Sequence, residues 1–387
     1  MIERKKIKVL YINHETRGEG GSTASLINLI HSVEKEVKPI VLVRSKENLV
    51  NFKKAGIKCF YYPFSQNVAD TNRIRGTINY LPRMFRDYFL DKKCVKKVAY
   101  LLREEIIEIV HSNSSVIGVG LEIARKLQAK SIIHLREFLD LDFKTRPFWG
   151  WKSVKRIIMR SDYVIAITQA IYNHWNVATL NTKSSVMWNA VRKAKTILPV
   201  IHNKDKYVLF CASRATENKG VFDAVEIFCK SGLPQLGFIL RIVGRTDNAT
   251  RERILRIAKT FASANQICFL GYVKEIDILM NKASAFLMCS KNEALGRVTI
   301  EAMFAGCPVL GRNSGGTKEL IKHGVNGYLY NDINEGAKLL KDIVGYSETT
   351  TRLIEEGRSF AINNFSEEVY GNKIIAIYNQ LVKQNLF

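Results

Sequence analysis

The chain has 387 residues, of which 47% are hydrophobic and 25% are charged, close to the average of soluble globular proteins. This composition excludes a disordered or fibrous chain, and the length favours two domains over one. The net charge is +23, and residues 1–200 hold 35 basic and 17 acidic residues, a net +18. Such an excess points to anionic partners: nucleic acid, an anionic membrane or phosphorylated substrates.

The short apolar runs of the chain alternate with amphipathic segments. We expect strands at 9–12, 40–43, 107–111, 132–134, 163–167, 185–188, 207–211, 238–243, 267–270, 285–288 and 308–310. We expect helices at 22–31, 118–126, 221–229, 251–261, 299–305, 317–323 and 367–382. The alternation predicts parallel sheets with helices on both faces, and the number of elements predicts two doubly wound α/β domains.

The domain boundary is expected where a strand gives way to a polar, basic stretch that contains Pro199. This predicts an N-terminal domain at 1–190, a linker at 191–204 and a C-terminal domain at 205–365. A loop is predicted at 363–366, and the C-terminal helix within 366–387 is expected to pack back on the first domain.

The seven cysteines are scattered and contain no Cys-x-x-Cys pair, which is typical of reduced thiols rather than a disulfide or zinc framework. No apolar run approaches the ~18 residues that a membrane span needs. The basic first residues precede only a short apolar run, unlike a signal peptide. We therefore expect a cytoplasmic protein, free or peripherally attached to the inner face of the cell membrane.

The most informative segment follows the strand at 285–288, where the sequence predicts a loop and then a helix beginning near Gly296. Helix N-termini at the carboxyl ends of parallel strands offer free N–H groups to phosphate. Glu293 and Glu301 would lie about 12 Å apart along a helix, too far to share acid–base work on one bond. They could instead bind the two hydroxyl-rich ends of a sugar nucleotide, although this spacing also occurs by chance on solvated helices.

This segment resembles the signature of family 4 glycosyltransferases, the retaining enzymes of GT-B fold that act in bacterial capsule, lipopolysaccharide and exopolysaccharide synthesis. The residues in register are Glu293, Gly296, Glu301, Ala302, Met303, Gly306, Pro308 and Val309. Ala294 and Leu295 replace the family's Gly and Phe, which bears on the sugar pocket. The resemblance implies two Rossmann-like domains that face each other across a cleft, with the acceptor on the N-terminal domain and the nucleotide sugar on the C-terminal one.

Arg214 and Lys219 match a cationic pair of the same family. Two cations after the first strand of a domain suit a diphosphate leaving group, although a solvated loop is the alternative. The resemblance implies that Glu293 holds the sugar hydroxyls and Glu301 the ribose. It also implies donor contacts from the positions around them, which are Asn292, Leu295, Gly296 and Arg297.

Two candidates for the donor side lie in the N-terminal half. Gly20 and Gly21 form a glycine turn before a predicted helix, although the turn lacks the spacing of dinucleotide-binding folds. His134 ends a predicted strand, and the resemblance implies that it faces the donor sugar. His111 is the competing candidate, expected nearer the acceptor, and a purely structural role remains the alternative for a single histidine.

Asp140 and Asp142 imitate the Asp-x-Asp metal motif of the other glycosyltransferase fold. Because Arg214 and Lys219 already supply positive charge, we expect neither a metal nor a cofactor.

Two segments, 71–103 and 143–160, combine basic residues with aromatic ones. A basic face with aromatic anchors suits an anionic membrane. Nucleic acid would accept the same charge, but no nucleic-acid module is visible, so we expect no nucleic-acid partner. A solvated basic face over buried aromatics is the alternative.

Together these features predict a metal-independent retaining glycosyltransferase that uses a nucleotide sugar, a UDP-sugar first and GDP-mannose next. The expected acceptor is a saccharide or lipid-linked saccharide of cell-surface polysaccharide biosynthesis. A sugar-nucleotide epimerase, a phosphorylase and a non-catalytic partner subunit are the alternatives.

Overall fold

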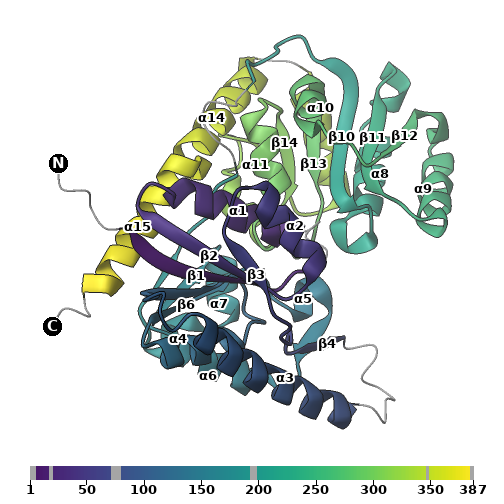
Figure 1. Ribbon diagram of the computed structural model, residues 1–387. Coiled ribbons are helices and arrows are strands. Elements are labelled where there is room, and N and C mark those ends of the chain that lie inside the picture. The colour runs from purple at the N-terminus through teal and green to yellow at the C-terminus, as the bar shows by residue number, and fades with distance from the viewer. Residues whose placement is uncertain (1–5, 17–20, 71–79, 192–197, 346–347, 384–387) are drawn as a thin grey trace, which may run out of the picture. The chain divides into compact units, whose positions relative to one another are not determined.

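The computed structural model describes residues 6–16, 21–70, 80–191, 198–345 and 348–383. The chain divides into two compact units (Figure 1): unit 1 comprises Met1–Ala190 and Glu367–Phe387, and unit 2 comprises Val191–Ser366. Each unit is built on a parallel sheet with helices packed against it, so the predicted pair of α/β domains is confirmed.

Unit 1 has a seven-stranded parallel sheet in the order β3-β2-β1-β5-β6-β8-β9, beside a small antiparallel pair, β4-β7. The chain adds β2 and β3 on one side of β1 and then continues with β5 on the other. The strands are β1 (Ile7–Asn13), β2 (Val37–Val43), β3 (Cys59–Tyr61), β4 (Val68–Asp70), β5 (Ile109–Ser112), β6 (Lys130–Leu135), β7 (Thr145–Pro147), β8 (Tyr163–Ala166) and β9 (Ser184–Val186). The helices are α1 (Gly21–Val33), α2 (Lys46–Lys54), α3 (Tyr80–Leu101), α4 (Val119–Leu127), α5 (Asp140–Phe143), α6 (Trp151–Arg160), α7 (Gln169–His174) and α15 (Glu367–Lys383).

The last helix of the chain, α15, completes the core of unit 1. It lies alongside α1 in Figure 1, where it is yellow. Its apolar face joins β1, β2 and α1 in one buried cluster, through Tyr370, Ile374, Ile377, Tyr378 and Leu381. Removing these large side chains from water favours docking of the helix by the hydrophobic effect.

Unit 2 has a six-stranded parallel sheet in the order β12-β11-β10-β13-β14-β15. Its strands are β10 (Asp205–Arg214), β11 (Ile239–Arg245), β12 (Ile267–Gly271), β13 (Ala283–Met288), β14 (Val309–Arg312) and β15 (Tyr328–Tyr330). Its helices are α8 (Val221–Lys230), α9 (Asn248–Thr260), α10 (Ile276–Lys282), α11 (Arg297–Phe304), α12 (Thr317–Leu320), α13 (Ile333–Val344) and α14 (Glu348–Phe365). Single-turn 3₁₀ segments include η3 (Glu217–Lys219).

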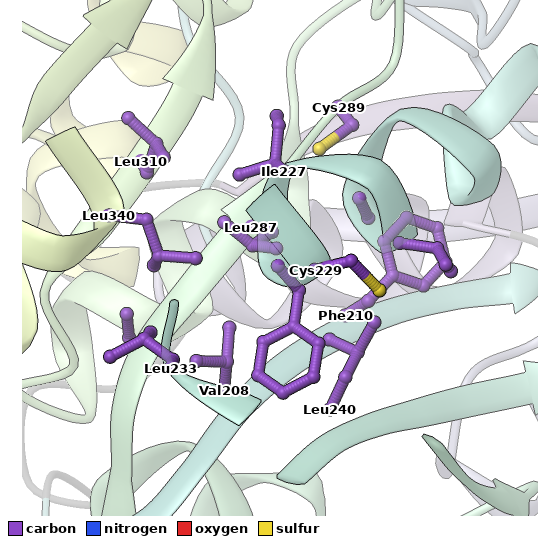
Figure 2. Packing of buried hydrophobic residues seen from close by; sticks show 14 of the residues in the cluster. Val208, Phe210, Ile227, Cys229, Leu233, Leu240, Leu287, Cys289, Leu310 and Leu340 are labelled. Carbon is purple, nitrogen blue, oxygen red and sulfur yellow. The ribbon is translucent and has the colours of Figure 1, made fainter. Parts of the chain in front are cut away.

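The core of unit 2 lies between α8 and the central strands. Figure 2 shows Val208 and Leu240 of the sheet beside Ile227 and Cys229 of α8. These strands are buried on both faces, and their sequences are therefore nearly continuous apolar runs, which is the usual pattern of parallel sheets.

Three segments differ from the expectation. The helix predicted at 317–323 ends after one turn, at Leu320, because the chain becomes extended at Ile321. The loop predicted at 363–366 is wrong, since α14 continues to Phe365 and only Ser366 separates it from α15. Residues 198–204 of the expected linker pack on unit 2, where the Lys204 Nζ donates to the carbonyls of Asn281 (2.6 Å) and Gly306 (2.8 Å).

Candidate active site

The candidate site lies where unit 2 reverses its order of strand addition. After β12 the chain returns to the opposite side of β10 and places β13 there. In open α/β sheets ligands bind beyond the carboxyl ends of the strands at such a switch point. The segments that follow β10 and β13, residues 214–220 and 289–297, contain most of the residues predicted for the donor.

The two central charges of the site form an ion pair. The Lys219 ammonium lies 2.8 Å from the Glu293 carboxylate, and the Glu293 side chain is only 17% exposed. The two loops approach closely because Gly220 has φ +75° and no side chain: a Cβ there would lie 2.1 Å from the carbonyl oxygen of Cys289. Glycine at this position therefore brings Lys219 to the end of β13.

The first turn of α11 is open to an anion. Gly296 precedes the helix with φ +84°, no side chain caps it, and its first turn contains no acidic residue. Its first residue, Arg297, donates from Nε to Glu301 at 2.9 Å, and the buried Arg297 Nη1 has no partner among the described residues. An arginine at the positively charged N-terminus of a helix is unfavourable by itself. A phosphate bound there would interact favourably with both the arginine and the helix end.

The remaining predicted donor positions surround this turn. Asn292 is exposed, whereas Leu295 is buried below the loop. The Gly316 N–H donates to the Glu293 carbonyl at 2.7 Å, which fixes the loop to the segment after β14. Arg214 ends β10 at the same edge of the sheet, next to Arg245 of β11, and its side chain is exposed.

The glycine turn of unit 1 is described only in part. Gly20 lies outside the described residues, and Gly21 is the first residue of α1. The Glu15 carboxylate accepts the N–H groups of Ser22 (3.2 Å) and Thr23 (3.0 Å). An internal carboxylate thus occupies the start of α1, in contrast to the open start of α11.

The two histidines lie in one buried network rather than at separate places. His111 of β5 and His134 of β6 are fully buried, with the His111 Nε2 3.2 Å from the His134 Nδ1. The His111 Nδ1 lies 2.8 Å from the Tyr378 hydroxyl, so the network reaches α15. Burial and the charge of Arg136 lower the pKa of His111 to about 3, which keeps this ring neutral.

The two aspartates of the metal-like motif have local partners. Asp142 accepts the N–H groups of Phe138 (3.0 Å) and Leu139 (2.8 Å). Asp140 lies 3.2 Å from His174. Across the described residues, no three His, Cys, Asp or Glu side chains gather closely enough to hold a metal ion.

Sequence reasoning missed Arg136, whose Nη2 lies 3.2 Å from the His134 Nδ1. Its side chain is only 8% exposed. The only signal in the sequence is its place two residues after a histidine, at the end of a strand. Burial of a single arginine cannot be read from that pattern.

Residues 195–360 match the model of the family described as glycosyl transferases group 1. This segment, somewhat less than half of the chain, is similar to that family. It contains the five charged residues predicted for the donor in the C-terminal domain, which are Arg214, Lys219, Glu293, Arg297 and Glu301. The predicted resemblance to glycosyltransferases is confirmed for these residues.

Other comparisons extend the similarity over the rest of the chain. The chain is 28% identical over 181 residues to the lipopolysaccharide core biosynthesis glycosyltransferase LpsE of Rhizobium meliloti, covering 46% of this chain and 50% of that protein. It is 23% identical to the uncharacterized glycosyltransferase MJ1178 of Methanocaldococcus jannaschii, covering 94% and 95%. The crystal structure of Anabaena Alr3699/HepE in complex with UDP superposes with a TM-score of 0.74 at 18% identity, covering 97% and 100%.

The structural similarity identifies the fold as GT-B, in agreement with the prediction. The alignments to the first three curated relatives span 50%, 32% and 62% of those proteins' own length. Within the described residues, no helix combines the length and apolarity needed to cross a bilayer.

Proposed function

We propose that the protein is a retaining glycosyltransferase that transfers a sugar from a nucleotide sugar without a metal ion. The donor that we favour is a UDP-sugar. The observation that carries the proposal is the group of charges at the carboxyl edge of the unit 2 sheet: the Lys219–Glu293 pair beside the uncapped, arginine-bearing start of α11. The group 1 family match of the same segment supports it.

In this proposal the cations act on the leaving group. Arg214, Lys219 and the N–H groups at the start of α11 stabilise the diphosphate as its bond to the sugar breaks. Glu293 accepts hydrogen bonds from the sugar hydroxyls, and Glu301 from the ribose. Because Lys219 is paired with Glu293 in the structure, a bound donor would share or replace that contact.

The proposed acceptor is a saccharide or lipid-linked saccharide of cell-surface polysaccharide synthesis. The supporting relative is the Rhizobium protein, whose name places it in lipopolysaccharide core biosynthesis. Another supporting match is a crystal structure of HepE in complex with UDP-glucose, since it shows that donor bound to a protein of the same fold.

The purified protein should hydrolyse one member of a panel of nucleotide sugars slowly in the absence of acceptor. Excess EDTA should leave that rate unchanged, because the proposed site uses Arg214 and Lys219 in place of a cation. Product anomers identified by NMR would test retention. Hydrolysis that requires a divalent ion, or an inverted product, would contradict the corresponding part of the proposal.

We also propose that unit 1 docks on the inner face of the cell membrane. The supporting surface is α3, where Phe85 and Phe89 are 54% and 67% exposed and the Tyr88 ring contacts the ring of Trp149. Exposed lysines follow on the same helix: Lys92, Lys93, Lys96 and Lys97. Exposed aromatic side chains next to basic ones are typical of proteins that lie on anionic bilayers.

A further inference from the structure

A buried arginine without an ion-pair partner lies in unit 1. Arg136 follows β6, with its side chain only 8% exposed. Its Nη2 donates to the His134 Nδ1, and the Tyr370 side chain is a second polar neighbour of the guanidinium. Its Nε and Nη1 have no hydrogen-bond partner in the part of the chain that the structure describes. Nε and Nη1 hold three of the five N–H groups of a guanidinium, so most of its donors are unused.

The neighbouring carboxylates are engaged elsewhere. Glu137 accepts from the Ser114 hydroxyl at 2.6 Å and from the Ser115 N–H at 2.8 Å. Glu15 caps the start of α1. Tyr370 and both acids are near enough to favour the charge of Arg136, but neither acid forms an ion pair with it. A buried charge without a direct partner is strongly unfavourable, so an anion is the ligand that this position favours.

His134 adds another donor to the same place. Arginine can only donate, so the His134 Nδ1 accepts, and the proton of the neutral ring is on Nε2. Burial and the charge of Arg136 hold the pKa of His134 well below its usual value, which keeps the ring neutral. The buried Nε2 has no partner within the described residues. The cluster therefore offers four unused N–H groups.

The cluster lies close to the point where the chain reverses the direction in which it adds strands to the unit 1 sheet. β5 and β6 follow β1 on the side opposite β2, and Arg136 comes directly after the carboxyl end of β6. A ligand is expected in this position of an open α/β sheet. In this unit Glu15 already occupies the start of α1, so the guanidinium rather than a helix end is available to an anion.

We propose that Arg136 and His134 bind an oxyanion, a carboxylate or a phosphate group, on the sugar acceptor. That the acceptor carries this group rests on the proposed function, whereas the anion site itself does not. Guanidinium N–H groups match the oxygens of both anions, and a neutral sugar would leave the charge of Arg136 unpaired.

The test is thermal unfolding of the full chain with glucuronate, glucose 6-phosphate or glucose, at constant ionic strength set with NaCl. Wild-type protein should gain on the order of 5 °C in Tm with one or both anionic sugars at saturation, and nothing with glucose. The anion with the larger effect identifies the group. Arg136→Met should lose the gain, and its Tm without ligand should equal or exceed that of the wild type, since an unpaired buried charge has been removed.

Two further variants keep the test decisive. Arg136→Lys retains the charge with fewer donors and should reduce the gain, even where Arg136→Met does not fold. Arg358→Met removes a matched arginine of unit 2, whose N–H groups donate to the carbonyls of Leu198 and Phe304. The Arg358→Met variant should have a lower Tm without ligand, but its Tm should still rise with the anionic sugar. An equal gain in wild type and Arg136→Met, an undiminished gain in Arg136→Lys, or an equal gain with glucose would overturn the proposal.

The result can be separated from the test of the proposed function. UDP binding to the wild-type protein, measured by calorimetry, reports on unit 2. Absence of UDP binding with an intact anion effect would contradict the glycosyltransferase proposal and leave the anion site standing. UDP binding without any anion effect would contradict the anion site and leave the glycosyltransferase proposal standing.

Discussion

Lys219 and Glu293 are 74 residues apart in the sequence and 2.8 Å apart in the fold. An exposed lysine would be an ordinary surface charge, but here it lies against a largely buried carboxylate at a sheet switch point. The carboxylate neutralises the lysine. We therefore expect the donor's diphosphate to compete with Glu293 for this cation.

The cations of the site should matter for turnover. Lys219→Ala and Arg214→Ala should each lower kcat/KM by about 10²-fold, because each removes a charge that stabilises the departing diphosphate. Steady-state kinetics with the nucleotide sugar that the hydrolysis panel selects would measure the change. Lys230→Ala, which removes an exposed lysine of the same unit, is the matched control and should have little effect. Activity within threefold of wild type in both site variants would contradict the assigned role.

Substitutions of the two glutamates should differ in their effect on the affinity for UDP, the nucleotide without its sugar. Glu301→Gln should weaken UDP binding, because the proposed ribose contact exists with or without the sugar. Glu293→Gln should leave UDP affinity unchanged or tighter, since Lys219 loses its internal partner, while donor turnover falls. Calorimetry with UDP would compare them. Equal affinities in the two variants would rule out this division of roles.

The sequence singles out these candidate residues but does not predict the contact between two of them. Glu293, Glu301, Arg214 and Lys219 are visible from spacing and resemblance, whereas the contact between Lys219 and Glu293 depends on strand order. Arg136 was missed for a related reason. Its burial and its lack of an acidic partner result from the packing of β6, which a single chain position does not encode.

At the scale of elements, the buried strands were easy to predict because they are short apolar runs such as those of β10 and β13. The helical nature of α3 was not predicted. Its inward face, which includes Cys94, Val95 and Val98, is interrupted by pairs of lysines, and aromatic residues occupy its outer face. The mixture resembles a surface patch more than an amphipathic helix.

The contact between α15 and α1 depends on a small side chain. A Cβ on Gly371 would lie 2.2 Å from the carbonyl oxygen of Ser32. Gly371→Ala should therefore push α15 away from α1 and lower the stability of unit 1 by about 1–3 kcal/mol. Calorimetric unfolding of the variant should show a lower transition for unit 1 and an unchanged one for unit 2. The control is Gly345→Ala, because a Cβ at that position would lie no closer than 3.4 Å to its neighbours. Gly232→Ala is unsuitable, because Gly232 has a positive φ that alanine adopts poorly.

The buried histidines should make unit 1 sensitive to acid. Burial lowers the pKa of His111 from about 6.5 in the unfolded chain to about 3. A group whose pKa is lowered by folding stabilises the fold above its unfolded pKa and loses that effect as the pH falls toward its folded pKa. The Tm of unit 1 should thus fall between about pH 6.5 and 3.

A variant can separate this effect from general acid denaturation. His111→Gln removes one titrating group and should flatten the dependence of Tm on pH across that range, although its Tm at neutral pH will be lower. His323→Gln, at an exposed position of unit 2, should keep the wild-type slope. Identical slopes in all three proteins would show that His111 does not cause the acid sensitivity.

At the scale of the whole molecule, the charge is unevenly shared, with a net +18 in residues 1–200. Reversing Lys92, Lys93, Lys96 and Lys97 to Glu should abolish binding to vesicles that contain acidic lipid. Each basic residue near such a surface contributes about 1 kcal/mol, and the attraction fades as salt rises. Co-sedimentation at several salt concentrations would measure it.

The matched control is a reversal of equal size on unit 2. Helix α9 has four exposed basic residues, Arg251, Arg253, Arg256 and Lys259. Their reversal to Glu should reduce vesicle binding much less if α3 is the docking surface. Equal losses in the two variants would mean that total charge, rather than α3, determines binding.

The return of the chain to unit 1 has a consequence for the order of synthesis. Residues 191–366 leave the ribosome as one uninterrupted stretch and can fold as they appear, whereas unit 1 lacks α15 until all of unit 2 has been made. At about 5–20 residues per second, the first 190 residues wait on the order of 10 to 40 s for that helix. During this interval the surface that α15 later covers, around Leu26, Leu29 and Ile30 of α1, stays open to other apolar segments. Unit 1, whose strands are translated before unit 2, therefore completes its core after unit 2.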